Sequence, residues 1–290
     1  MSEPLPRLSY PCRRIGDFSV VAISDGTLTA GLDLLSNIDV DDATGIMQRA
    51  GIAAPSSVNI NCYVIRGNGR TVLVDTGAGG IRNWGGLLMP SLTQAGIDAH
   101  DIDTILLTHA HPDHIGGLLD PHGQPAFPHA EVLIHERELA FWLDDAAFEH
   151  ANERARGNFR IARRAFDACR RRLRSFEAGA VLPGIVAVPL PGHTPGHTGY
   201  RIESHDERLL IWGDLVHFAP IQVMRPDVSI AFDHDPALAV ATRAAMLAEA
   251  ASDNLLIAGM HLAETGFARI ARAHGETGGV YALTGAAFRA

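Results

Sequence analysis

The stretch THAHPDHIGG, residues 108–117, decides how the rest of the chain is interpreted. It directly follows a short apolar run that has the composition of a β-strand. Alternation at a strand end places His109 and His111 on one face, and the turn beyond brings Asp113 and His114 to a second point nearby. Because imidazole nitrogens and carboxylate oxygens suit Zn²⁺ and related divalent ions, this spacing predicts a metal site.

Three further residues of the ligand type end other apolar runs. His193 follows the run at 185–190, Asp214 follows LLIWG and His261 follows LLIAGM. An α/β fold usually gathers its site at strand ends, so we expect these side chains to join the first cluster. The candidate ligands are then His109, His111, Asp113, His114, His193, Asp214 and His261, which is enough for two metal ions.

The order of these motifs resembles the metallo-β-lactamase superfamily, whose signature is His-x-His-x-Asp-His, then Gly-His, an Asp after a strand and a late His. The segments NINCYVI (59–65) and TVLVDTG (71–77) are similar to the hairpin strands and the Asp-Thr-Gly turn that precede the metal motif in that family. The resemblance runs from about Val58 to about Arg272. It implies an α/β fold, the αββα sandwich of two mixed β-sheets flanked by helices.

We expect residues 1–290 to form a single domain of this fold. Residues 1–57 would be an N-terminal arm with the first strands, and residues 136–178 a helical insert that caps the pocket, as the resemblance implies.

Within the superfamily, the chain is most similar to the methyl parathion hydrolase and N-acyl homoserine lactonase branch. The motifs GHTPGHT (192–198), WGD (212–214) and GMHL (259–262) carry this likeness. Several of those lactonases have a Tyr three residues after the bridging Asp, where it is thought to contact the substrate carbonyl. Here that position is His217, and an imidazole can also donate a hydrogen bond, so we expect His217 to face the substrate.

The resemblance also implies how the ligands divide. One metal would be held by His109, His111 and His193, the second by Asp113, His114 and His261, with Asp214 bridging both. The cofactor would be two divalent ions per chain, Zn or alternatively Mn, Fe or Co, since all accept these ligands. A metal-bridging hydroxide would be the nucleophile, and Asp113 or Asp214 would carry a proton to the leaving oxygen. The catalytic residues are thus Asp113, Asp214 and His217.

These features predict a dinuclear hydrolase that opens an ester-type bond, foremost a lactone. Phosphotriester hydrolysis, as in methyl parathion hydrolase, and thioester hydrolysis of the glyoxalase II type are alternatives. A di-iron redox protein would need a flavin domain downstream of residue 290. A non-catalytic metal-binding protein is disfavoured because all seven ligands are intact.

Outside the metal motifs, the pattern predicts several elements. Helical spacing from 136 to 176 includes one apolar face made of Phe159, Ala162, Phe166, Cys169, Leu173 and Phe176. Its opposite face, 154–174, is Arg-rich, which we interpret as a solvated face paired with nearby acids rather than a binding surface. Further expectations are a strand at 18–23 with a turn at Asp25-Gly26, and helices at 41–50, 90–99 and 236–251.

Some side chains are expected to support the site. Asp75 and His197 are interpreted as partners of the ligands rather than ligands themselves, because ligating imidazoles need acceptors for their other N–H. Apolar lining of the pocket is sought among Phe141, Trp142, Phe218, Met224 and Phe267.

Composition limits the partners. The net charge of −9 gives no support to binding of nucleic acid or an anionic membrane, so we expect a small ester-type molecule as the partner. Three scattered cysteines and an N-terminus without signal-peptide features favour a cytoplasmic protein, and no run of about 20 apolar residues is present. The N-terminal arm suggests a homodimer.

Overall fold

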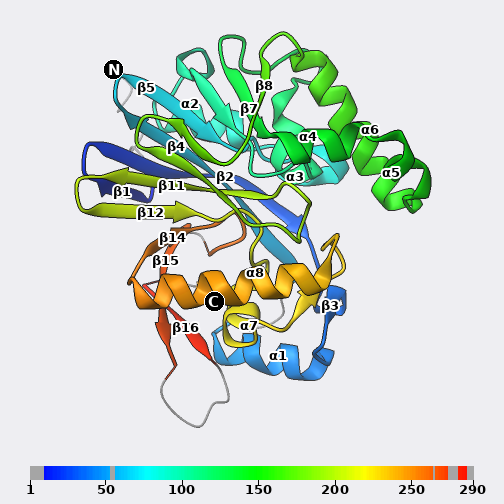
Figure 1. Ribbon diagram of the computed structural model, residues 1–290, viewed down its shortest axis with the longest axis vertical. Coiled ribbons are helices and arrows are strands. Elements are labelled where there is room, and N and C mark those ends of the chain that lie inside the picture. The colour runs from blue at the N-terminus through cyan, green and yellow to red at the C-terminus, as the bar shows by residue number, and fades with distance from the viewer. Residues whose placement is uncertain (1–9, 53–55, 264, 274–279, 286–290) are drawn as a thin grey trace, which may run out of the picture.

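The computed structural model describes residues 10–52, 56–263, 265–273 and 280–285. Within these residues, the strands form two seven-stranded sheets and one two-stranded sheet (Figure 1). The first sheet has the order β1 (Cys12–Ile15), β2 (Phe18–Thr29), β4 (Ser57–Gly67), β5 (Arg70–Val74), β6 (Thr104–Leu106), β7 (Glu131–His135), β8 (Leu173–Phe176). The second has the order β16 (Tyr281–Thr284), β15 (Phe267–Arg272), β14 (Leu256–Ala258), β12 (Glu207–Ile211), β11 (Thr198–Ser204), β10 (Ile185–Pro189), β9 (Gly179–Leu182).

Both large sheets are mixed. In the first, β5 to β8 run parallel to one another while β1, β2 and β4 pair antiparallel. In the second, β12 and β14 are parallel neighbours, and the other pairings are antiparallel. The small sheet joins β3 (Leu35–Ser36) to β13 (Ser229–Ile230).

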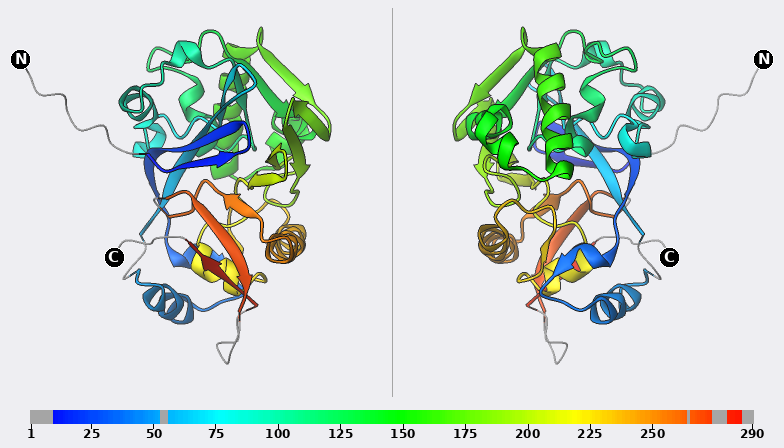
Figure 2. Two further views of the ribbon diagram at one scale, coloured as in Figure 1. Left: turned by 90° about the vertical axis from the view of Figure 1, so that its left-hand side faces the viewer. Right: turned by 90° about the vertical axis from the view of Figure 1, so that its right-hand side faces the viewer.

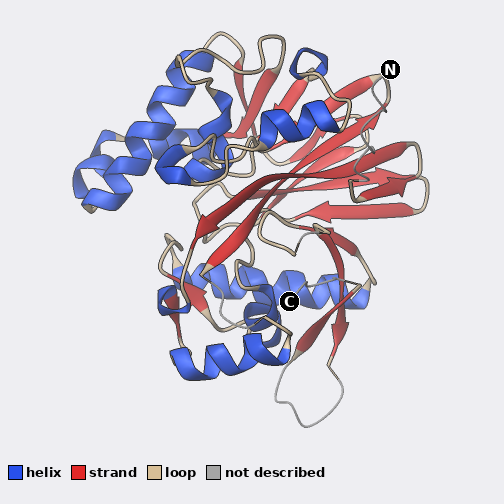
Figure 3. Ribbon diagram, turned by 180° about the vertical axis from the view of Figure 1, so that it is seen from behind, coloured by secondary structure: helices blue, strands red, loops and turns tan. Residues whose placement is uncertain are grey.

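Helices cover the outer faces of the sheets, as Figures 1 and 3 show. On the first sheet lie α2 (Leu88–Gln94), α4 (Glu136–Leu143) and α6 (Glu153–Cys169), while α3 (Pro112–Ile115) follows β6 and α5 (Asp145–His150) packs on α4 and α6. On the second sheet lie α7 (Ala219–Met224) and α8 (Pro236–Ser252), with α1 (Val40–Arg49) beside α7. Turning the molecule by 90° shows α8 end-on, away from the green helices of the insert (Figure 2). The predicted αββα sandwich is therefore confirmed. Among the described helices, none is long and apolar enough to cross a membrane.

The period of two along each strand separates the two apolar layers of the sandwich. In β2, Phe18, Val20 and Ala22 face the second sheet, whereas Val21 and Ile23 face the helices of the first. The sheet-on-sheet core is closed from the other side by alternate residues of β10, β11 and β12. Burial of both faces makes the inner strands rigid supports for the loops at their ends.

The helical segment expected at 136–176 is confirmed as far as Cys169 and is wrong beyond it. It consists of three helices, with Asp144 and Asn152 capping the starts of α5 and α6 by accepting N–H groups. The apolar face is correct through Cys169, but Leu173–Phe176 forms strand β8, which pairs parallel with β7. Leu173 and Phe176 match helical spacing by coincidence, and the open edge of the first sheet decides their structure.

Two smaller expectations also differ. Asp25-Gly26 is a bulge inside β2 rather than a turn, with Gly26 at φ 107°, and the strand continues to Thr29. The Asp25 carboxylate accepts backbone N–H groups from Ala78, Gly86 and Leu88, which fixes the loop after β5. The helix expected at 90–99 is α2, displaced towards the N-terminus at Leu88–Gln94. The helices expected at 41–50 and 236–251 are confirmed as α1 and α8.

Candidate metal centre

The candidate ligands come from loops at the ends of four strands. His109 and His111 follow β6, and Asp113 and His114 lie on the single-turn helix α3 that begins at Pro112. His193 lies between β10 and β11, while Asp214 and His261 follow β12 and β14. Since β12 and β14 are parallel neighbours, their ends deliver Asp214 and His261 side by side.

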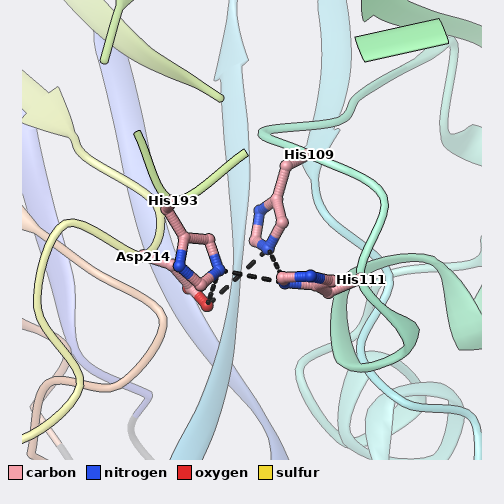
Figure 4. Close-up of side chains that lie close together, drawn as sticks. All are labelled: His109, His111, His193 and Asp214. Carbon is pink, nitrogen blue, oxygen red and sulfur yellow. Dashed lines mark hydrogen bonds and ion pairs between the residues drawn. The ribbon is translucent and has the colours of Figure 1, made fainter. Parts of the chain in front are cut away.

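One group of side chains contains three imidazoles and a carboxylate, shown in Figure 4. His109 Nε2 lies 3.0 Å from His111 Nδ1, which in turn lies 2.9 Å from His193 Nε2. Asp214 Oδ2 lies 3.7 Å from His109 Nε2 and 3.4 Å from His193 Nε2. Ligand-type atoms from β6, β10 and β12 thus point at one small volume.

A second group shares Asp214 with the first. His114 Nε2 lies 3.3 Å from Asp113 Oδ2 and 3.2 Å from Asp214 Oδ1. His261 Nε2 lies 3.2 Å from Asp214 Oδ2 and 3.6 Å from Asp113 Oδ2. The two oxygens of Asp214 therefore reach into both groups, and the structure brings together all seven residues that the sequence singled out.

The chemistry of these residues fits divalent cations. Burial lowers the pKa of His109 and of His111 well below the ordinary value, which leaves neutral imidazoles with free lone pairs. Burial opposes ionisation of Asp214, but the surrounding imidazoles, His114 foremost, hold its pKa well below the ordinary value. In the described part of the chain, His114 Nε2 and Asp214 Oδ1 are buried without a hydrogen-bond partner. A cation between them would satisfy both atoms.

Three of the imidazoles that would bind metal are oriented through their other nitrogen. His114 Nδ1 donates to Asp75 Oδ2 at 2.7 Å, and His193 Nδ1 donates to Asp233 Oδ1 at 2.9 Å. His261 Nδ1 donates to the carbonyl oxygen of Asn59 at 2.7 Å. These contacts fix the ring tautomer and direct Nε2 into the centre.

His197 has a supporting position. Its Nδ1 donates to the carbonyl oxygen of Leu190 at 2.8 Å, and its Nε2 accepts the backbone N–H of Asp214 at 3.0 Å. Both nitrogens are engaged, so His197 fixes the backbone that carries Asp214 instead of offering a lone pair to a metal.

A metal-dependent site at these strand ends agrees with the comparison to known families. The profile of the metallo-beta-lactamase superfamily matches residues 57–261. The chain belongs to the metallo-β-lactamase superfamily. A Bacillus subtilis (strain 168) protein, "Uncharacterized protein YobT", is 30% identical over 146 residues, which are 50% of this chain and 58% of that protein. The match thus spans less than two thirds of this curated relative.

Two solved structures match nearly the whole chain. The hydrolase AbOPH is 27% identical with a TM-score of 0.88, and the comparison covers 97% of this chain and 98% of AbOPH. AidC, a dizinc quorum-quenching lactonase solved with the product N-hexanoyl-L-homoserine, is 26% identical with a TM-score of 0.87 and the same coverage. Because each comparison covers 97% of this chain, the likeness includes the helical insert between β7 and β8.

Glu138 of α4 is a buried carboxylate that sequence reasoning missed. Its Oε1 accepts the N–H of Ala110 at 3.0 Å and of Trp142 Nε1 at 2.6 Å. Its Oε2 accepts from Thr194 Oγ1 at 2.6 Å and from the N–H of Gly196 at 3.0 Å. One side chain of the insert thereby joins the loop that carries His109 and His111 to the loop that carries His193. The pattern around Glu138 shows only a helix and no sign of this role.

Asp233 and Arg243 form another support that the sequence did not reveal. The guanidinium of Arg243 is buried and donates to the carbonyl oxygens of Leu215 and Val228 at 2.7 and 2.6 Å. Its Nη2 lies 3.7 Å from Asp233 Oδ2. The pair holds the partner of His193 and the loop after Asp214 in one arrangement.

A narrow cavity of about 30 Å³ opens above the centre. Its lining residues are Leu28, Arg82, Trp84, His111, Pro112, Asp113, Arg154, Asn158, Asp214, His217, Phe232 and His261. The five aromatic and Met residues expected to line it do not, as far as the structure describes the chain. Phe141 and Trp142 instead pack in the core beneath the insert, and Phe267 packs between the sheets.

His217 lies at the floor of this cavity. Its Nε2 lies 3.1 Å from Asp214 Oδ2, and its ring stacks on that of His261 with centroids 4.9 Å apart. Burial lowers the pKa of His217 to about 4, so the ring is neutral near pH 7. Its Nδ1 is buried with no hydrogen-bond partner among the described residues.

Proposed function

We propose that this protein is a metal-dependent hydrolase that opens ester-type bonds, and that its substrate is a lactone. The observation that carries the proposal is the pair of buried His/Asp groups that share Asp214 beneath an open cavity. Such a pair is suited to two divalent ions, of which Zn²⁺ is our first choice. The 26% identity to AidC over 97% of the chain supports the lactone assignment.

The protein residues have distinct parts in this chemistry. Two bound ions would supply an activated water and positive charge beside the scissile carbonyl. The imidazoles hold their Nε2 or Nδ1 atoms ready, and Asp214 joins the two groups through its two oxygens. A carboxylate oxygen of Asp113 or Asp214 takes up the proton and delivers it to the leaving oxygen.

His217 completes the set as a hydrogen-bond donor to the substrate. Its position in the cavity lining and its neutral state support this role. A neutral imidazole N–H stabilises an oxygen that gains negative charge as the ester bond breaks.

The test is a combined metal and substrate assay. Gently purified protein should contain close to two equivalents of transition metal and should hydrolyse lactones faster than phosphotriesters, thioesters or β-lactams. One equivalent or less, with no gain in activity on adding Zn²⁺, Mn²⁺ or Co²⁺, would contradict the dinuclear centre. Faster turnover of phosphotriesters or thioesters would replace the lactone assignment while keeping the hydrolase.

A further inference from the structure

The cavity above the centre is edged by two guanidinium groups. Arg82 lies in the short turn Ile81–Asn83, and Arg154 lies in the first turn of α6; both line the cavity with Asp113 and Asp214. Among the described residues, no carboxylate oxygen lies within 4.0 Å of either guanidinium.

Two other arginines of α6 differ from Arg154 in this respect, because Arg160 pairs with Glu153 at 3.1 Å and Arg163 with Asp145 at 2.8 Å. Just after the helix, Arg170 pairs with Asp167 at 3.0 Å. These pairs agree with the interpretation of a solvated Arg-rich face. Arg154 departs from it, because this guanidinium is directed to the cavity.

Aromatic and amide contacts fix both guanidinium groups. The Cζ atom of Arg154 lies 4.1 Å from the ring centroid of Phe232, and that of Arg82 lies 5.1 Å from the ring of Trp84. Arg82 Nη2 also donates to Asn158 Oδ1 at 3.1 Å. Arg82 has φ 57°, a left-handed conformation that is costly for a residue with a Cβ. The turn Ile81–Asn83 keeps Arg82 in this conformation, and the Arg82 side chain lines the cavity as a result.

The two positive charges lie near each other in a protein whose net charge is −9. Partial burial, and then the neighbouring charge of Arg82, lower the pKa of Arg154, and the more distant charge of Asp113 offsets part of this. Arginine nevertheless keeps its charge near neutral pH. Two like charges without a directly paired carboxylate are unfavourable until an anion lies between them. Guanidinium groups bind carboxylate and phosphate oxygens in a bidentate manner, so the geometry is suited to such an anion.

We propose that Arg82 and Arg154 bind an anionic oxygen group, a carboxylate or a phosphate, that the substrate carries beside its scissile ester. The enzyme then prefers acidic lactones to neutral ones of the same size. This inference rests on the proposed hydrolysis of lactones. It assigns substrate specificity to the mouth of the cavity, formed by Arg82 and Arg154, while the reaction takes place at the floor, formed by the ligand residues and His217. Asn158 is a positioning residue that orients Arg82.

A matched pair of substrates tests the preference. The γ-lactone 5-oxotetrahydrofuran-2-carboxylate and its 2-carboxamide share one ring and differ in charge. Metal-loaded wild type should show kcat/KM about 10-fold higher for the acid, because the guanidinium groups donate charge-assisted hydrogen bonds to its carboxylate. Arg82→Gln and Arg154→Gln should each reduce that ratio, and the double variant should abolish it. Arg160→Gln, which removes the same charge from α6 outside the cavity, should leave it unchanged.

Calorimetric binding separates this inference from the proposed function. The hydrolysis products, 2-hydroxyglutarate and its amide counterpart, are titrated into the metal-loaded wild type and into the arginine variants. The diacid should bind wild type at least several-fold more tightly, with the difference lost in the double variant and reduced at high ionic strength. If neither lactone is hydrolysed, the lactonase proposal fails, yet this titration still decides the role of the arginines.

One further substrate identifies the anion, and one further variant tests whether the planar guanidinium is needed. A γ-lactone with a phosphonooxymethyl group replaces the carboxylate in the same assay, and the larger kcat/KM assigns phosphate or carboxylate. Arg154→Lys keeps the charge but loses the planar fork, so it should retain part of the preference. Equal binding of diacid and amide by wild type, or an undiminished preference in the double variant, would overturn the inference. Circular dichroism checks that each variant is folded.

Discussion

The floor and the mouth of the cavity are built in opposite ways. At the floor, buried ligands are held by buried partners, such as Asp75 on His114 and Asp233 on His193. At the mouth, Arg82 and Arg154 are exposed and are held by aromatic faces and one amide. A fixed floor keeps the reactive geometry constant, while an exposed mouth can change its charge without disturbing it. Floor variants should therefore affect catalysis and stability, and mouth variants substrate choice.

The largest effect is expected from Asp214→Asn. This variant removes the negative charge that both groups share and replaces one of the two ligand oxygens by an amide nitrogen, so kcat/KM should fall by about 10³ or more. Metal content, measured by elemental analysis, should fall with it. Asp206→Asn, the same change in the exposed turn between β11 and β12, should have neither effect. Equal, mild losses in the two variants would show that the ligand assignment is wrong.

His217→Ala tests where the floor meets the substrate. Loss of one donor to a developing negative charge costs about 10²–10³ in kcat. Both metals should remain bound, because His217 is in neither of the two ligand groups. Unchanged kcat and KM at full metal loading would exclude a catalytic role for His217.

The sequence predicts the floor because metal chemistry leaves a local signature. His109 to His114 occupy six consecutive positions, and the other ligands each end an apolar run. The sequence also indicates the supports Asp75 and His197, which lie in or beside the family motifs. Asp233 and Asn158 leave no such trace, since Asp233 meets His193 across 40 residues and Asn158 meets Arg82 across 76. Strand β8 was missed for a similar reason, because its partner is an edge made by distant residues. Long-range pairing is decided by packing, which a single sequence does not display.

Glu138→Gln should weaken the hydrogen bonds that connect the loop of His109 and His111 to the loop of His193. The Glu138 side chain accepts four hydrogen bonds, two at each carboxylate oxygen. In the Gln variant an amide NH2 replaces one of these oxygens, so two donors lose their acceptor. An unsatisfied buried group costs about 1–3 kcal/mol, which urea unfolding should detect. Glu136→Gln, an exposed change on the same helix, is the control. A stability equal to that of wild type would mean that the two metal-binding loops do not depend on Glu138.

The pH dependence of stability should reveal His197. Burial lowers its pKa from 6.5 to about 3 in the folded chain, so below pH 6.5 the unfolded chain binds a proton that the folded chain does not. The stability contributed by neutral His197 is thus present above pH 6.5 and is lost as the pH falls towards 3. Relative to His197→Gln, the free energy of unfolding of wild type should fall by about 1 kcal/mol per pH unit in this range, measured by urea unfolding at saturating metal. If the difference in free energy of unfolding between wild type and His197→Gln does not change with pH, this account is wrong.

The smallest effect is expected at the mouth, from Phe232→Leu. Leucine keeps an apolar side chain at this position but removes the aromatic face on which Arg154 lies. A cation–π contact at an exposed site contributes about 0.5–1 kcal/mol, so KM for the acidic lactone should rise about two- to fivefold. The neutral carboxamide should be hydrolysed as before, and kcat should be unchanged because Phe232 belongs to neither ligand group. Phe148→Leu is the matched control, since Phe148 lies under Arg160 and Arg163 outside the cavity. If the two variants change KM equally, or if kcat falls in Phe232→Leu, the division between a catalytic floor and a selective mouth does not hold.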